Sequence, residues 1–192
     1  MLFVILDPIG TIPFFQWLTK EITSAQRREV ARRSVLIAMF LLLVFAYLGQ
    51  AILALLSMNI YDFEIAGGAL LLVFAIRDAL ANESLGASES AAAVGKSTFE
   101  RIAVIPLATP LLAGPGSLTT SILLANADYG YLIAGVAILV DSLLAFIALS
   151  VSDNLNRFIG PSGLMIVGKV LDILMTTIAV SYLVTGVAGV GF

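Results

Sequence analysis

The chain has 192 residues, of which 60% are hydrophobic and only 12% are charged, and its mean hydropathy is +1.06. Soluble domains are about a quarter charged and under half apolar, so this composition predicts an integral membrane protein. The absence of cysteine and histidine excludes disulfides, a thiol nucleophile and any metal site or general base built on histidine. The net charge is −3 and no long basic patch occurs, so nucleic-acid binding is not expected either. We expect no metal and no cofactor.

The first apolar segment covers residues 2–19 and is interrupted by DPIGTIP, from Asp7 to Pro13. Proline inside a helix removes a backbone donor and clashes with the preceding turn, so we expect the helix to be unwound there. Only six residues precede Asp7, whereas a spanning helix needs about 20. We therefore expect either an unusually short first helix or a natural start upstream of Met1.

Two further helices complete the first half of the chain. Thr23 and Gln26 have the spacing of a capping box, which predicts a helix from about residue 24 to residue 57. A third helix is expected from residue 63 to about residue 80. Residues 82–98 are small and polar, as is typical of a loop. We expect them to form a cytoplasmic linker between two halves, 1–81 and 99–192, of a single membrane domain.

The fourth segment contains the second interruption. Residues 102–125 carry no charge and are long enough to cross a membrane, yet PLATPLLAGPGSLTT, residues 106–120, holds three prolines and two glycines. In hydrocarbon, broken backbone persists only where protein or a water-filled cavity receives its polar groups. The segment is therefore a candidate binding site. Helices are expected again over about 131–152 and 162–187, with residues 153–161 as a loop.

The basic residues predict the orientation of the chain in the membrane. Eight lysines and arginines fall in the first, third and fifth connections, and none fall in the second and fourth connections or at the termini. By the positive-inside rule, both termini lie outside. We expect a multi-pass protein of the prokaryotic plasma (inner) membrane.

The two interruptions occupy corresponding places in the two halves. Pro8, Gly10 and Thr11 interrupt the first helix as Pro115, Gly116 and Ser117 interrupt the fourth. The third and sixth helices also correspond, with IAGGAL (65–70) and IVGKVL (166–171). The predicted fold is all-α: a polytopic membrane bundle of six transmembrane helices, built as two inverted three-helix repeats, with helices 1 and 4 broken near the midplane. The alternative is that proline and glycine are simply common in membrane helices.

Three segments, DPIGTIPFFQWLT, FEIAGGALLL and IPLATPLLAGPGSLTT, resemble signature segments of the MarC family of bacterial and archaeal membrane proteins. The likeness covers essentially the whole chain. This family is usually placed near the LysE superfamily and includes small neutral amino acid transporters. The resemblance implies six helices, export or uptake of amino acids such as glycine and alanine, and coupling to protons.

The broken helices suggest how such a substrate is bound. The amides and positive dipole end of the half-helix after Gly116 suit a carboxylate, and Asp7 is the nearest acidic candidate for the ammonium group. Glycines without side chains favour a small ligand held close to the backbone. The predicted substrate-binding residues are Asp7, Pro8, Gly10, Thr11, Gly114, Pro115, Gly116, Ser117 and Thr119. For the hydroxyl residues, the competing interpretation is packing between helices.

Three charged residues lie inside apolar spans. Asp141 is about midway along the fifth helix, and Lys169 and Asp172 are three residues apart on the sixth. Charges at this depth need a partner, neutralisation or a wet cavity. We expect Lys169 to bridge the two carboxylates, either as a proton-coupling site or as a static ionic lock.

The leading functional hypothesis is a secondary transporter of small neutral amino acids, working in a lipid bilayer with a coupling proton. The alternative is a channel or permease for an ion or another small solute, with a filter built from carbonyls. An enzyme is not expected, since no paired catalytic motif occurs. A scaffold without transport activity and a homo-oligomer are both compatible with the sequence.

Overall fold

The computed structural model describes residues 1–19, 22–80, 107–109, 112–127 and 130–190, and their regular structure is entirely helical. The helices are α1 (Leu2–Leu6), α2 (Thr11–Leu18), α3 (Ser24–Leu55), α4 (Ile60–Leu80), α7 (Pro115–Asn126), α8 (Gly130–Ser150) and α9 (Ser152–Val190). The expected linker, residues 82–98, lies outside the described residues, as does most of the fourth helix before Pro115.

Several helices have the length and composition of membrane spans. Within the described residues, three stretches are long and apolar enough to cross a bilayer: Ser24–Leu55, Gly130–Ser150 and Ile166–Val190. Their outward faces carry large apolar side chains, among them Phe40 (64% exposed), Leu132 (79%) and Val184 (64%). A soluble monomer rarely exposes so much apolar surface, so these faces fit lipid.

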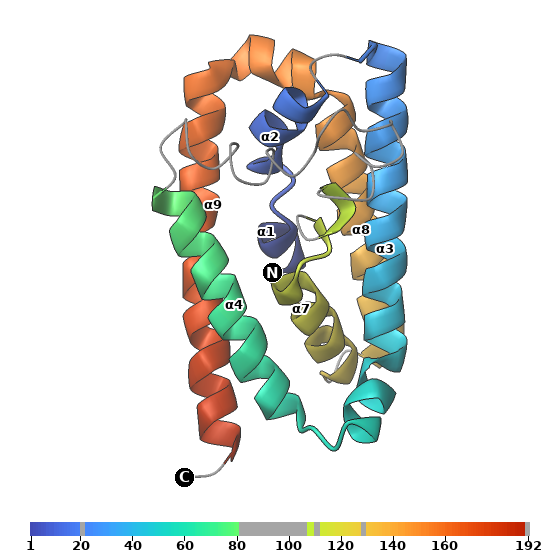
Figure 1. Cartoon of the computed structure of the whole chain (residues 1–192), viewed down its shortest axis with the longest axis vertical. Coiled ribbons are helices and arrows are strands. Elements are labelled where there is room, and N and C mark those ends of the chain that lie inside the picture. The colour runs from blue at the N-terminus through green and yellow to red at the C-terminus, as the bar shows by residue number, and fades with distance from the viewer. Residues whose placement is uncertain (20–21, 81–106, 110–111, 128–129, 191–192) are drawn as a thin grey trace.

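Among the described helices, three short ones lie between four long ones. In Figure 1, α4 and α9 lie on one side of the bundle and α3 and α8 on the other, with α1, α2 and α7 between them. The short central helices are those that flank the two predicted interruptions. The two interruptions therefore lie inside the bundle, between the long helices.

The start of α3 confirms the predicted capping box. The hydroxyl of Thr23 accepts a hydrogen bond from the backbone N–H of Gln26 at 3.3 Å, and the side chain of Gln26 accepts one from the N–H of Thr23 at 3.0 Å. These two bonds satisfy amides that the first helical turn cannot pair internally. The helix begins at Ser24, as predicted.

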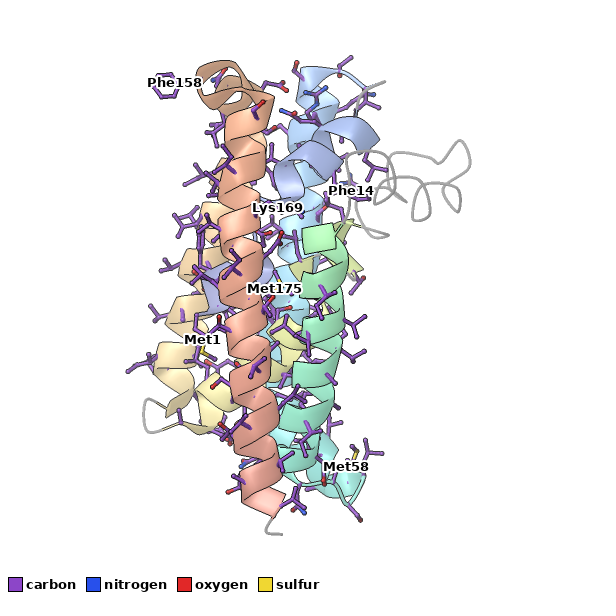
Figure 2. The ribbon with its side chains drawn as sticks, turned by 90° about the vertical axis from the view of Figure 1, so that its left-hand side faces the viewer. Met1, Phe14, Met58, Phe158, Lys169 and Met175 are labelled. Atoms are coloured by element: carbon purple, nitrogen blue, oxygen red, sulfur yellow. The ribbon has the colours of Figure 1, made fainter. Side chains whose placement is uncertain are left out.

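The prediction of a loop at residues 153–161 is wrong. Helix α9 begins at Ser152, and its described backbone is helical apart from Gly160, which has φ 77° and ψ 162°. Positive φ costs glycine little, so the chain turns at one residue and resumes its helix. Gln16 donates a hydrogen bond to the carbonyl of Ser152 at 3.0 Å, and Arg27 pairs with Asp153, so distant segments anchor this first part of α9. Phe158, 92% exposed, projects outward near the turn (Figure 2).

Candidate functional site

The first interruption lies between Leu6 and Thr11 and is organised by Asp7. Asp7 is buried, and its backbone is in the left-handed helical region with φ 40° and ψ 60°. Aspartate adopts this conformation more readily than most residues. Its N–H donates to the carbonyl of Phe3 at 3.1 Å, and its own carbonyl accepts from the N–H of Thr11 at 3.1 Å. Its carboxylate accepts from the N–H of Gly10 at 3.0 Å. Asp7 thus closes α1 and holds the start of α2.

The break is narrower than the sequence predicted. Pro13 was expected in the unwound stretch, but it is the third residue of α2. Proline is tolerated in the first helical turn, where its missing N–H has no helical partner. The non-helical part is therefore confined to residues 7–10.

Helix α9 passes directly beside this break. A Cβ added to Gly168 would lie 3.7 Å from the Cα of Gly10, and one added to Gly10 would collide with the carboxylate of Asp7. Asp172 follows Gly168 by four residues and therefore lies on the same face of α9. The sixth predicted helix thus presents a glycine and a buried carboxylate toward the first interruption.

The second interruption precedes α7. The N–H of Ala113 donates a hydrogen bond to the carbonyl of Ala108 at 2.8 Å, and Gly114 is extended with φ −85° and ψ 172°. Pro115 is the first residue of α7, and no side chain caps this helix. The N–H groups of Gly116 and Ser117 have no carbonyl one turn earlier within the helix. The helix end therefore presents amide donors at the break.

The two interrupted segments pack against each other. Ile12 and Phe15 of α2 share a buried apolar cluster with Leu107, Leu112 and Ala113 before the second break. On the other side, Leu2 and Leu6 of α1 cluster with Ala125 of α7. Each half of the first segment thus packs beside one half of the second, and α1, α2 and α7 lie together in the centre of the bundle (Figure 1).

The predicted hydroxyl ligands donate to backbone carbonyls. Ser117 donates to the carbonyls of Leu112 and Gly114, both at 3.0 Å. Thr119 donates to Pro115 at 2.9 Å, and Thr11 donates to Asp7 at 2.5 Å. A hydroxyl has one proton to donate, so these groups stabilise broken or first-turn backbone in this state. A direct role in binding stays a prediction.

Two of the three predicted membrane charges, Lys169 and Asp172 on α9, form an ion pair. The Nζ of Lys169 lies 3.7 Å from Oδ2 of Asp172, whose side chain is only 2% exposed, whereas that of Lys169 is 41% exposed. Figure 2 shows Lys169 and Met175 along this helix. Asp141 on α8 is half-buried and makes no ion pair with any residue that the structure describes. Two of the three predicted charges are thus paired, and the coupling role of the set remains a prediction.

A third buried carboxyl group, besides those of Asp7 and Asp172, was not among the site residues predicted from the sequence. Glu64 on α4 is 8% exposed and lies one turn before Gly68, where an added Cβ would be 3.0 Å from the Cβ of Tyr182. The hydroxyl of Tyr182 lies 2.9 Å from that of Thr120. A signal was available: an acidic residue in an apolar span with no basic residue three or four positions away on either side.

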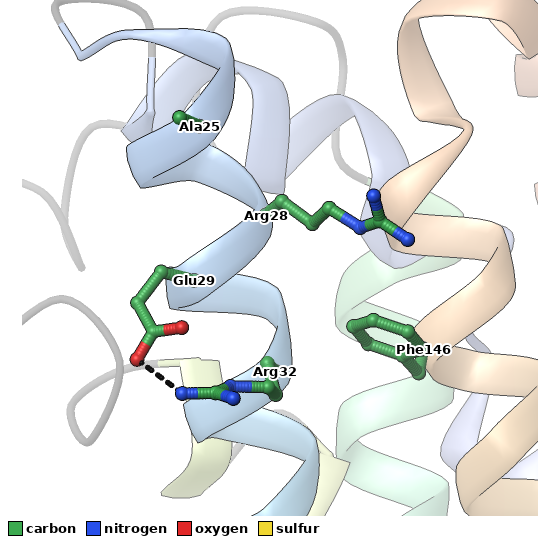
Figure 3. Close-up of a pocket in the computed structure, with 5 residues that line it drawn as sticks. All are labelled: Ala25, Arg28, Glu29, Arg32 and Phe146. Atoms are coloured by element: carbon green, nitrogen blue, oxygen red, sulfur yellow. Dashed lines mark hydrogen bonds and ion pairs between the residues drawn. The ribbon is translucent and has the colours of Figure 1, made fainter.

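A cavity of about 320 Å³ lies elsewhere, between the start of α3 and α8. Figure 3 shows its lining, in which Glu29 pairs with Arg32 at 2.9 Å. Its lining residues are Ala25, Arg28, Glu29, Arg32 and Phe146. None belongs to either interruption, so this cavity is separate from the candidate site.

Comparison with known proteins places the chain among membrane proteins. The model of the "MarC family integral membrane protein" family matches residues 1–190. A UPF0056 membrane protein of Methanocaldococcus jannaschii is 34% identical, over 98% of this chain and 93% of that protein. The UPF0056 inner membrane protein YhgN of Escherichia coli is 30% identical, over 97% and 92%, and a UPF0056 membrane protein of Aquifex aeolicus is 31% identical, over 96% and 88%. These names state no substrate and no catalytic activity, and no solved structure matches the chain significantly.

Proposed function

The chain belongs to the MarC family of integral membrane proteins and is a multi-pass protein of the plasma (inner) membrane, and from this premise we propose that it is a proton-coupled secondary transporter of small neutral amino acids such as glycine and alanine. The observation that carries the proposal is the packing of two interrupted helical segments against each other inside a bundle of long apolar helices. Transporters with such helices bind their substrates at the interruptions.

The proposed ligand matches the polar groups at the two breaks. The uncapped amides of Gly116 and Ser117 suit a carboxylate, and the buried carboxylate of Asp7 suits an ammonium group. Gly114 carries no side chain at the second break, which favours a small substrate held close to the backbone, whereas the position of a Cβ on Gly10 is taken by the carboxylate of Asp7. A zwitterion with a short side chain satisfies both polar ends at once.

Reciprocal glycine contacts support an inverted repeat of 1–81 and 99–192. Gly67 and Gly168 hold the same position in IAGGAL and IVGKVL. Gly168, in the second half, lies against Gly10 of the first broken segment. Gly67, in the first half, lies against Thr119 of the second, where an added Cβ would be 2.7 Å from the Cβ of Thr119. Each half thus covers the broken helix of the other, as expected for two related units with both termini outside.

Thermal stabilisation by amino acids tests the proposal. A ligand that binds only the folded state stabilises it by about 2.7 kcal/mol at 100 times its Kd. For a chain of this size, we expect the Tm to rise by roughly 5–10 °C with glycine or alanine. If no small neutral amino acid raises the Tm, while a salt or another solute does, the channel or permease hypothesis replaces this one.

Two serine variants locate the effect. Ser117→Ala removes a hydroxyl that bonds to two carbonyls at the break, and should reduce the stabilisation by glycine at least several-fold. Ser121→Ala is the matched control, because its buried hydroxyl bonds to the carbonyl of Leu118 at 2.7 Å, one turn further along α7. If glycine stabilises both variants equally, the ligand does not bind at the second interruption.

A further inference from the structure

Helix α4 packs against both α9 and α7 and carries one buried carboxyl group, that of Glu64. The residue is 8% exposed, and its Oε2 atom has no hydrogen-bond partner in the described part of the chain. Gly68, one turn further along α4, lies so close to α9 that an added Cβ would be 2.9 Å from the carbonyl oxygen of Ala179. The helices are thus in backbone contact beside Glu64.

No cation lies among the described groups that face Glu64. From α9 the ionisable group nearby is Tyr182, which is 6% exposed. Its Cβ would lie 3.0 Å from a Cβ added to Gly68, one turn along α4 from Glu64. Lys169 and Asp172 are ten or more residues away from Tyr182 on α9, which is about 15 Å or more of helix. Helix α7, PGSLTTSILLAN, contains no ionisable residue.

Among the described residues, the remaining neighbours of α4 supply no counter-charge either. On α4 itself, Asp62 is acidic, and its carboxylate accepts a hydrogen bond from the N–H of Asn59 at 2.9 Å. Arg77 follows Glu64 by thirteen residues on α4, which is about 20 Å of helix. Helix α1 meets α4 further along, where Ile5 clusters with Leu71 and Ala75. An ionised carboxylate with an unpaired oxygen inside a membrane protein is costly, and a bound proton removes that cost.

The hydroxyl groups beside Glu64 form a chain that leads to the second interruption. The hydroxyl of Thr120 lies 2.9 Å from that of Tyr182 and donates to the carbonyl of Gly116 at 2.7 Å. Because Thr120 has one proton, Tyr182 must be the donor to Thr120 in this arrangement. The proton of Tyr182 is then unavailable to Glu64, which agrees with the unpaired Oε2.

We propose that Glu64 is a proton-binding site that communicates with the start of α7 through Tyr182 and Thr120. The carboxylate takes one proton from solution and loses its negative charge, and it returns the same proton on release. When Glu64 is ionised, Tyr182 donates to it, Thr120 donates to Tyr182, and the carbonyl of Gly116 is released. When Glu64 is protonated, the observed arrangement returns. The inference rests on the proposed function in one respect: Gly116 belongs to the proposed substrate site, so this proton is the coupling proton.

Infrared titration in lipid vesicles without substrate tests the proton site directly. We expect a protonated-carboxyl band that disappears as the pH rises, is absent in Glu64→Gln and persists in Asp62→Asn, a control with the same change of charge on the same helix. Tyr182→Phe should shift the midpoint pH of this band. A titrating band that is unchanged in Glu64→Gln overturns the inference.

Chemical labelling of the unmodified protein gives an independent readout that needs no variant to fold. A hydrophobic carbodiimide reacts with protonated carboxyl groups in membrane interiors, so mass spectrometry should find Glu64 labelled increasingly as the pH falls, and Asp62 unlabelled. Absence of label at Glu64 at every pH contradicts the inference. Thermal stabilisation by glycine is measured separately on the same protein. If glycine gives no stabilisation but Glu64 is labelled as expected, the transporter hypothesis is refuted and the proton site is retained.

Discussion

Replacing Gly68 with alanine tests the packing of α4 on α9, which holds the glycine-bearing helices of the two halves together. An added Cβ would lie 2.9 Å from the carbonyl oxygen of Ala179 and 3.0 Å from the amide nitrogen of Leu183. Ordinary contacts between carbon and oxygen are about 3.3–3.6 Å. Both neighbours are backbone atoms that cannot rotate away, so the two helices must separate by a few tenths of an ångström.

The magnitude follows from two opposing terms. Overpacking of this kind costs about 1–3 kcal/mol, and the better helix propensity of alanine recovers about 0.5–1 kcal/mol. The net loss is about 0–2.5 kcal/mol with a central value near 1 kcal/mol, and at that central value the Tm of a chain of this length falls by about 2–4 °C. Gly168→Ala is the matched control, because its Cβ would make an ordinary contact of 3.7 Å with Gly10, so its Tm should be unchanged or slightly higher.

Thermal unfolding of the two variants in one detergent, followed by circular dichroism, measures the difference. The reasoning requires Gly68→Ala to melt clearly below Gly168→Ala. If Gly68→Ala melts at or above the control, the close approach of α4 and α9 described above is refuted.

Two further substitutions test local features. Thr23→Ala removes the capping box of α3 and should cost about 1 kcal/mol of unfolding free energy, seen as a lower Tm than for Ser24→Ala at the adjacent, exposed position. Lys169→Met removes the cation paired with the buried Asp172 and should destabilise by about 1–3 kcal/mol, less than a fully buried pair because Lys169 is partly exposed. Adding Asp172→Asn should restore part of that loss in a double-mutant cycle, and strictly additive effects would show that the pair contributes nothing.

Local sequence signals predicted much of the helical arrangement. The spacing of Thr23 and Gln26 located the start of α3 because a capping box acts within one turn. Pro8 and Pro115, with the glycines beside them, located both interruptions because proline limits the backbone wherever it occurs. Such signals depend only on neighbouring residues.

Features fixed by distant contacts could not be predicted in this way. The polar stretch after Ser152 is typical of a loop, yet Gln16 and Arg27 hold it as the beginning of α9. The contact of Gly168 with Gly10 and the hydrogen bond between Thr120 and Tyr182 join segments far apart in the chain. Their pairing depends on how the helices pack, which no single stretch of sequence specifies.

Uptake of labelled glycine into proteoliposomes tests the central claim most directly. With an inward proton gradient, the account predicts saturable glycine uptake that excess alanine inhibits, that collapses with the gradient, and that is reduced in Ser117→Ala but not in Ser121→Ala. Glycine uptake absent under every gradient and orientation, or an unsaturable flux of simple ions in its place, would contradict it.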